Sequence, residues 1–220
     1  MKKNNDIIRF LATGDFHSDL KLVKKIQKEV DFSSIDFVLF TGDLSEKNND
    51  FKDLFSIFNS KKILMVPGNH ESKLQLDILK EKYKVHLVGN APVKINDELV
   101  IFGTNYLSIG PHGIYEEDVF KNLKINFDTI KDIKVKLMLS HIPPSNTSIG
   151  DGSPFDFIGG SDAVSFFLEN HHPDILLCGH IHETSGLEEI INKTKVVNVG
   201  RTFKIIEFNN KTKKLNVINL

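Results

Sequence analysis

The sequence predicts an α/β fold, because short apolar segments with strand character alternate with segments of helical spacing. Six apolar runs lead into polar clusters, most of which contain glycine: IIRFLATGD, DFVLFTGD, KILMVPGNH, LVIFGTN, VKLMLSH and DILLCGH. Runs of this length, rich in Val, Ile, Leu and Phe, are typical of buried strands.

Helices are expected between several of these strands, in chain order at 20–30, 49–58, 74–83 and 163–170. In each of these segments the apolar residues recur at the spacing of one helix face. The first three follow the first three strands in turn, and the fourth precedes the sixth strand.

The last three apolar segments are expected to be strands of a different kind. VVNVG, KIIEFN and KKLNVINL follow one another without a convincing helix between them. Successive strands of this type favour antiparallel pairing. We therefore expect an antiparallel group of strands to close the domain.

The overall composition fits one domain spanning residues 1–220. Apolar residues make up 40% of the chain and 17 residues are Phe, which is enough for a sizeable core. Basic and acidic residues number 28 and 29, giving a net charge of −1. A protein that grips nucleic acid non-specifically carries a basic excess, so nucleic acid is not an expected general partner.

The N-terminus and the cysteine content favour a cytoplasmic location. The first apolar run is broken by Arg9 and Asp15, which makes it too short for a signal peptide or a membrane span, and no membrane partner is expected. Cys178 is the only cysteine, so no internal disulfide can form. Within LLCGH it is expected to be a small buried residue and a poor nucleophile.

Most of the polar clusters stand at the carboxyl ends of predicted strands, where open α/β sheets bind ligands. We therefore expect the clusters to meet in space. Their side chains are Asp15 and His17 (GDFH), Asp43 (GDLSE), Asn69 and His70 (GNHE), His141 (SHIPP), and His180 and His182 (GHIH). This mixture of nitrogen and oxygen donors is the set that binds first-row divalent metals.

Each cluster alone has an ordinary structural explanation. A single His after a strand is often a hydrogen-bonded core residue, and an Asp after Gly is often a helix cap. Five such clusters in succession, all supplying metal-ligand side chains, favour a shared metal site over coincidence.

The ordered series GDFH, GDL, GNHE, SHIPP and GHIH resembles the motifs of the calcineurin-like metallophosphoesterase family, and the region from His141 to Gly200 resembles its small prokaryotic phosphodiesterase-like members. The resemblance implies a four-layer α/β/β/α sandwich of two packed mixed β-sheets flanked by helices. It also implies two divalent metal ions, with Mn²⁺ expected and Fe, Zn, Co or Ni compatible with the same donors. By this resemblance Asp43 bridges the two ions. The ligands of one ion would be Asp15, His17, Asp43 and His182, and those of the other Asp43, Asn69, His141 and His180.

This arrangement suits the hydrolysis of a phosphoester by metal-bound hydroxide. Two adjacent divalent ions repel each other, so a bridging carboxylate and a bridging hydroxide are needed between them. Coordination lowers the pKa of water toward about 7, which supplies a nucleophile without Ser or Cys. His70 resembles the family histidine that stabilises the transition state or protonates the leaving oxygen. The alternative is that His70 only orients Asn69.

Further polar residues are candidates for completing the site. Glu46, which stands near the position of an Asp in the protein-phosphatase branch, and Glu71 are candidate partners for His70, with solvated surface positions as the alternative. Arg201 and His112 are candidates for substrate binding, with an exposed edge-strand position as the alternative for Arg201. The segments 143–160 and 110–115 are expected to set substrate selectivity. For 143–160 the alternative is a disordered surface excursion.

The predicted function is metal-dependent hydrolysis of a small phosphoester, with a phosphodiester preferred. A phosphomonoesterase and a nuclease of the same family are alternatives, and the charge balance argues against the nuclease. An interaction scaffold that has no catalytic activity is an alternative from a different class. Every ligand position of the motif series is filled, which argues for an enzyme. The sequence makes no prediction of oligomeric state.

Overall fold

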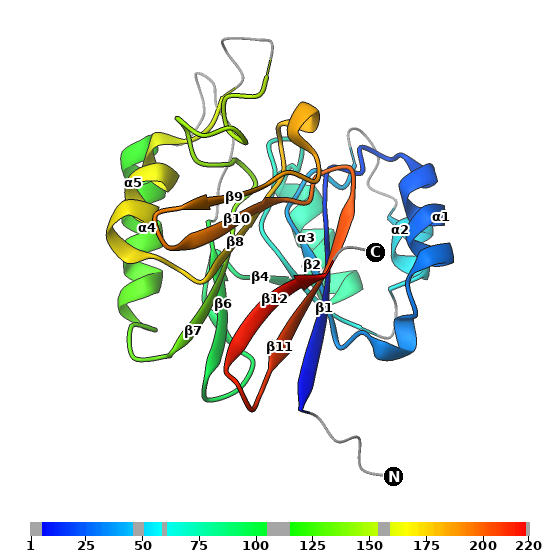
Figure 1. The fold of residues 1–220 in the computed structure, drawn as a ribbon. Coiled ribbons are helices and arrows are strands. Elements are labelled where there is room, and N and C mark those ends of the chain that lie inside the picture. Colours follow the sequence, from blue (N-terminus) through cyan, green and yellow to red (C-terminus); the bar gives the residue numbers. More distant parts are fainter. Residues whose placement is uncertain (1–5, 46–50, 59–60, 105–114, 154–158, 219–220) are drawn as a thin grey trace.

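The computed structural model describes residues 6–45, 51–58, 61–104, 115–153 and 159–218. Its strands form two mixed six-stranded sheets, with the orders β12-β11-β1-β2-β3-β4 and β5-β6-β7-β8-β10-β9. In Figure 1, α1 and α2 lie on one side of the molecule and α4 and α5 on the opposite side, with the sheets between them. The chain therefore has the four-layer α/β/β/α arrangement that the motif resemblance implied.

The first sheet has a parallel part that an antiparallel hairpin extends. The parallel strands are β1 (Ile7–Thr13), β2 (Phe37–Phe40), β3 (Lys62–Met65) and β4 (His86–Leu87). The hairpin strands are β11 (Phe203–Asn209), which pairs with β1, and β12 (Lys214–Ile218). The helices that follow β1, β2 and β3 are α1 (Leu20–Glu29), α2 (Lys52–Ser56) and α3 (Lys73–Tyr83). These confirm the first three predicted helices, although the described part of α2 is shorter than predicted.

The second sheet repeats this plan with antiparallel strands at both edges. Its parallel strands are β6 (Leu99–Gly103), β7 (Val135–Leu139), β8 (Ile175–Cys178) and β10 (Thr194–Asn198). Its edges are β5 (Val93–Lys94) and β9 (Glu188–Ile191). The helices on its outer face are α4 (Glu116–Asp128) and α5 (Asp162–His171), and short 3₁₀ turns form η1 (Phe32–Ser34) and η2 (His182–Thr184). Helix α5 confirms the fourth predicted helix.

Buried apolar side chains fill the three spaces between the four layers. Phe10 and Ile206 of the first sheet pack with Leu137 and Val197 of the second. The outer faces are covered by helices, as where Phe167 of α5 packs against Phe102 at 6.1 Å between ring centroids. Because the central strands are covered on both faces, they read as continuous apolar runs rather than as alternating patterns.

Helix α4 was not predicted, and a buried polar residue explains why. Val119 and Leu123 lie one turn apart on its buried face, as expected of an amphipathic helix. One turn further along the same face is Asn126, whose side-chain amide donates to the carbonyl oxygen of Gly89 at 2.8 Å. A polar residue at this point interrupts the apolar stripe in the sequence.

The prediction of one antiparallel C-terminal group is confirmed for β11 and β12, which pair antiparallel, and is wrong for β10. β10 belongs to the second sheet, where it runs parallel to β8, whereas β11 and β12 belong to the first. The chain crosses between the sheets at Gly200, which forms a parallel bridge with Gly14. Because this crossing needs only a short turn, the sequence gives no sign that consecutive strands join different sheets.

No helix within the described ranges combines the length and the apolar content needed to cross a bilayer.

Candidate metal centre

The turns that follow β1 and β2 lie side by side and begin the site. The backbone N–H of Asp15 donates to the carbonyl oxygen of Gly42 at 2.9 Å, and that of His17 donates to the carbonyl oxygen of Asp43 at 3.0 Å. Asp15, His17, Asp43 and His180 have φ angles of 51°, 45°, 53° and 69°. Left-handed conformations are uncommon for residues with a side chain and tend to cluster where function requires them.

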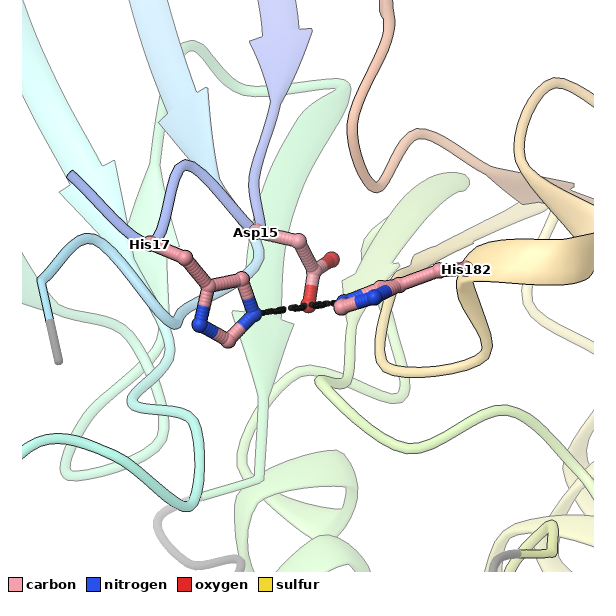
Figure 2. Close-up of side chains that lie close together, drawn as sticks. All are labelled: Asp15, His17 and His182. Carbon is pink, nitrogen blue, oxygen red and sulfur yellow. Dashed lines mark hydrogen bonds and ion pairs between the residues drawn. The ribbon is translucent and has the colours of Figure 1, made fainter. Parts of the chain in front are cut away.

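Two imidazoles face the carboxylate of Asp15, as Figure 2 shows. The Nε2 atoms of His17 and His182 lie 3.9 Å and 3.5 Å from Asp15 Oδ1, and 3.2 Å from each other. His17 comes from the turn after β1 and His182 from η2, so the group joins distant parts of the chain. Its side chains are unequally buried, since His17 is 8% and His182 is 34% exposed.

The carboxylate of Asp15 is held by the GHIH turn. It is fully buried and accepts the backbone N–H of His180 at 3.2 Å and 3.1 Å on its two oxygens. A Cβ atom at Gly179 would lie 2.1 Å from Asp15 Oδ2, and one at Gly200 would lie 2.3 Å from it. Glycine is therefore required at both positions for this close approach.

The carboxylate of Asp43 lies at the centre of the site. Asp43 Oδ1 accepts the backbone N–H of His70 at 2.9 Å. Asp43 Oδ2 faces three imidazole nitrogens, the Nε2 atoms of His141 at 3.3 Å, His17 at 3.6 Å and His70 at 3.9 Å. One oxygen thus meets imidazole nitrogens from three separate loops, a position that suits a bridging ligand.

His141 shows that the site is suited to a cation. Its Nδ1 lies 2.8 Å from the carbonyl oxygen of Thr41, which can only accept a hydrogen bond, so Nδ1 carries a proton. In the neutral imidazole, Nε2 then presents a lone pair toward Asp43 Oδ2 at 3.3 Å and Asn69 Oδ1 at 3.0 Å. Three acceptors that converge in this way require a metal ion or an additional proton among them.

Without a metal, a proton takes this place. Burial works to lower the pKa of His141, but the negative charge of Asp43 outweighs it and raises the pKa to about 9. Burial likewise works to raise the pKa of Asp43, but His141 holds it well below its usual range. The charges on this pair are therefore strongly linked.

His180 presents a neutral imidazole to the same region. Burial is the main cause that lowers its pKa to about 4. Its ring centroid lies 5.0 Å from that of His141, and burial also lowers the pKa of His17. Metals bind the neutral form of imidazole, so these two residues are in the required state near pH 7.

Glu71 holds two of the loops together. Its carboxylate accepts the backbone N–H groups of Asp43 at 3.0 Å, Leu44 at 2.6 Å and Gly68 at 2.6 Å. Burial is the main cause that raises its pKa, followed by the charge of Asp43. Glu71 thus fixes the turn after β2 against the turn after β3, so the alternative of a solvated surface position is wrong. Its role as a partner of His70 stays a prediction.

A cavity of about 290 Å³ opens onto these side chains. Its lining includes Ser153 and Glu183, which sequence reasoning missed, together with His17, Asp43, Asn69, His70, His180 and His182. Glu183 directly follows the GHIH motif, so its position in the sequence could have identified it as a residue of the site. Ser153 lies in 143–160, so part of this segment borders the site as predicted. The described part of the segment up to Ser153 also packs on the domain, since the carbonyl oxygen of buried Ile149 accepts a hydrogen bond from Thr184 Oγ1 at 3.0 Å. For this part the alternative of a disordered surface excursion is wrong.

Comparison with known proteins identifies the family. Residues 8–184 match the calcineurin-like phosphoesterases. The chain belongs to this family. It is similar, at 23% identity over 199 residues, to a "Probable cyclic nucleotide phosphodiesterase" of Vesicomyosocius okutanii subsp. Calyptogena okutanii (strain HA), covering 87% of this chain and 79% of that protein.

Solved structures support the same fold for this calcineurin-like phosphoesterase. The crystal structure of TT1561 of Thermus thermophilus has a TM-score of 0.67 at 18% identity, covering 97% of this chain and 99% of that chain. The phosphopantetheinyl hydrolase (PptH) from Mycobacterium tuberculosis has a TM-score of 0.67 at 12% identity, covering 97% of this chain and 96% of that chain. At these identities the likeness shows the shared sandwich fold and nothing beyond it.

The His and Asp side chains of this phosphoesterase fall into overlapping groups that suit a dinuclear metal site. In each group the ligand atoms lie within 4.8 Å of one another, and the groups are Asp15–His17–His182, His17–Asp43–His70 and Asp15–Asp43–His141. Asn69 and His180 adjoin His141 and line the cavity. The structure thus brings together all seven side chains predicted as metal ligands.

Other predicted residues have different outcomes. Arg201 is exposed, has a φ of 51° and donates its backbone N–H to Gly14, and its role in substrate binding stays a prediction. Glu46 and His112 lie outside the described residues, as does 110–115 apart from Tyr115. Cys178 is fully buried and burial raises the pKa of its thiol, which agrees with its predicted lack of nucleophilic character.

Proposed function

We propose that this phosphoesterase hydrolyses a small phosphodiester with the help of two divalent metal ions. The observation that carries the proposal is the position of Asp43 Oδ2, which faces the imidazoles of His141, His17 and His70 within 3.9 Å. We assign Asp43 as the bridging ligand. The remaining proposed ligands are Asp15, His17 and His182 on one side and Asn69, His141 and His180 on the other.

A pair of divalent ions in this site would supply an activated water near neutral pH and offset the charge of the phosphate. Asp15 and Asp43 together carry −2, which leaves net positive charge when two divalent ions are bound. This charge attracts a phosphoester anion to the cavity. Because Asp15 and Asp43 are almost fully buried, water screens this attraction only weakly.

His70 is placed to act on the reacting ester. Its side chain is 41% exposed and lines the cavity, while its backbone N–H is anchored on Asp43 Oδ1. It is the most accessible imidazole among those facing Asp43 Oδ2. We propose that His70 donates a proton to the leaving oxygen, a role that suits an imidazole near neutral pH.

Two observations support a diester over a monoester. A phosphomonoester carries up to two negative charges near pH 7, whereas a diester carries one, and the carboxylate of Glu183 in the cavity lining lowers the positive charge of the site and so reduces the advantage of the more highly charged ligand. The similarity to a probable cyclic nucleotide phosphodiesterase agrees with this preference.

The experiment compares bis-p-nitrophenyl phosphate with p-nitrophenyl phosphate as substrates, using EDTA-treated protein with Mn²⁺ added back. The wild-type chain should hydrolyse the diester faster. Asp43→Asn should lower the rate about 1,000-fold or more, a loss of about 4 kcal/mol of transition-state stabilisation. Asp97→Asn, the same change at an exposed turn, is the matched control and should leave the rate unchanged.

The alternatives predict other results. Faster hydrolysis of the monoester would support a phosphomonoesterase. A wild-type chain that stays inert with Mn, Fe, Zn, Co and Ni would contradict the enzyme proposal and support a scaffold.

A further inference from the structure

A second cavity, also of about 290 Å³, lies away from the metal centre. We name it the lysine cavity, after Lys61, Lys62, Lys82 and Lys84, which line it together with Tyr83 and His86. We propose that the lysine cavity binds a compact anion that carries more than one phosphate charge. This inference is independent of the proposed function.

The lysine cavity lies at the opposite ends of the elements that reach the metal centre. Lys62 begins β3, whereas Asn69 follows the end of that strand. Tyr83 ends α3, and this helix of 11 residues, about 16 Å long, begins two residues after Glu71. An anion in the lysine cavity would therefore not touch the ligands of the metal centre.

The charges around this cavity have one sign. No carboxylate is among the described residues that line it. Lys61 Nζ donates to the carbonyl oxygen of Ile35 at 2.7 Å, so one ammonium group is held in place. In the described part of the chain, Lys62, Lys82 and Lys84 form no ion pair, whereas other lysines do, as in Lys80–Asp77 at 3.1 Å, Lys124–Asp128 at 2.7 Å and Lys195–Glu188 at 2.7 Å.

Ordinary explanations account for only part of this cluster. Cations near a helix C-terminus are stabilised by the helix dipole, which explains Lys82 in the last turn of α3 and Lys84 at its C-cap. The dipole does not explain Lys61, which precedes β3, or Lys62, which begins it. Lys62 Nζ lies 6.0 Å from the centroid of the Phe37 ring, a contact that does not neutralise its charge. Nor does a general basic excess, because the whole chain carries a net charge of −1. A bound anion would relieve the repulsion among the four lysines.

The wall of the cavity strengthens its attraction for anions. Phe55 and Phe58 line it and are 2% and 0% exposed, and the ring of Tyr83 lies 4.4 Å from that of Phe55. A cleft with charges of one sign and an apolar wall focuses the electric field and concentrates counter-ions. Ligand cavities usually start at about 300 Å³, so the volume suits a small ligand. Two linked phosphate groups combine this size with enough charge for four lysines.

The test is isothermal titration calorimetry with inorganic pyrophosphate, on full-length protein treated with EDTA so that no metal ion recruits the probe. The double variant Lys62→Gln/Lys84→Gln removes two exposed lysines of the cavity. The control Lys24→Gln/Lys28→Gln removes two exposed lysines from α1 and changes the net charge equally. We expect pyrophosphate to bind the wild type. Its dissociation constant should be about tenfold or more higher for the cavity variant, and within about twofold of the wild-type value for the control.

Three results would overturn the proposal. The first is no binding of pyrophosphate to the wild type at millimolar concentration. The second is equal weakening in the two double variants, which would show a response to net charge alone. The third is binding that survives in the cavity variant but is lost in His180→Ala, which would place the anion at the metal centre. Unfolding curves of both double variants exclude misfolding as the cause.

Discussion

The two halves of the proposed metal centre differ in how firmly their side chains are held. In the buried half, which we name after His141, that residue is fully buried and anchored on the carbonyl oxygen of Thr41, and Asp43 is 3% exposed and bonded to the backbone of His70, although Asn69 is exposed. In the open half, His182 is 34% exposed and belongs to the short turn η2. Asp15 is the well-buried anchor of this half.

This difference predicts which of the two proposed metal ions is held more tightly. A side chain that is already fixed loses little conformational freedom when it binds a metal, whereas an exposed one must be ordered. The half that contains His141 should therefore retain its ion, and the half that contains the exposed His182 should exchange its ion more readily, although both halves line the cavity.

The largest expected effect separates the two halves by mutation. His141→Ala should lower activity about 1,000-fold and abolish retention of metal, whereas His182→Ala should lower it about 10- to 100-fold and keep one ion. Metal content after desalting and activity at saturating Mn²⁺ measure both effects. His172→Asn, at an exposed helix C-cap, is the control and should match the wild type. Loss of both ions in His182→Ala alone would reverse the comparison.

A smaller effect is expected from Glu71→Gln, which tests whether the hydrogen bonds of Glu71 to two loops fix the buried half. An amide presents one acceptor oxygen where the carboxylate presents two to the backbone of Asp43, Leu44 and Gly68. The Mn²⁺ concentration for half-maximal activity should rise about 10-fold, with a lower melting temperature. Glu81→Gln, an exposed change on α3, should alter neither. An unchanged Mn²⁺ requirement in Glu71→Gln would show that Glu71 does not support metal binding.

The smallest effect is a pH dependence of stability in EDTA-treated protein. The folded pKa of His141 is about 9, above its ordinary 6.5, so its contribution is present below pH 6.5 and is lost as pH rises through 9. The folded pKa of His180 is about 4, so its contribution is present above pH 6.5 and is lost as pH falls toward 4. The melting temperature should therefore peak near about pH 6.5.

Adding Mn²⁺ should remove the alkaline part of this dependence, because bound metal takes the place of the proton on His141. Melting curves from pH 4 to 9, with EDTA and with Mn²⁺, test this. Identical profiles under the two conditions would show that no metal binds at His141.

The sequence was sufficient to predict which side chains come together, for a physical reason, whereas the sandwich was implied by the motif resemblance. Proposed ligands such as Asp15 and His141 follow apolar strands, and parallel strands bring their carboxyl ends to one edge. The contact of the Thr41 carbonyl oxygen with His141 Nδ1 could not be predicted, because every residue offers the same backbone group. Ser153 reaches the cavity only through the folding of its loop. Helix α4 was missed because the polar Asn126 interrupts its apolar stripe. The separation of β10 from β11 was missed because the crossing at Gly200 needs only a short turn.

The most direct test of the central claim is a crystal structure with Mn²⁺, recorded at a wavelength where manganese scatters anomalously. Two anomalous peaks should flank the carboxylate of Asp43, roughly 3.5–4 Å apart. One peak should adjoin His141 and His180, and the other His17 and His182, with the second weaker at low Mn²⁺. A single peak away from Asp43, or no peak at saturating Mn²⁺, would contradict the account.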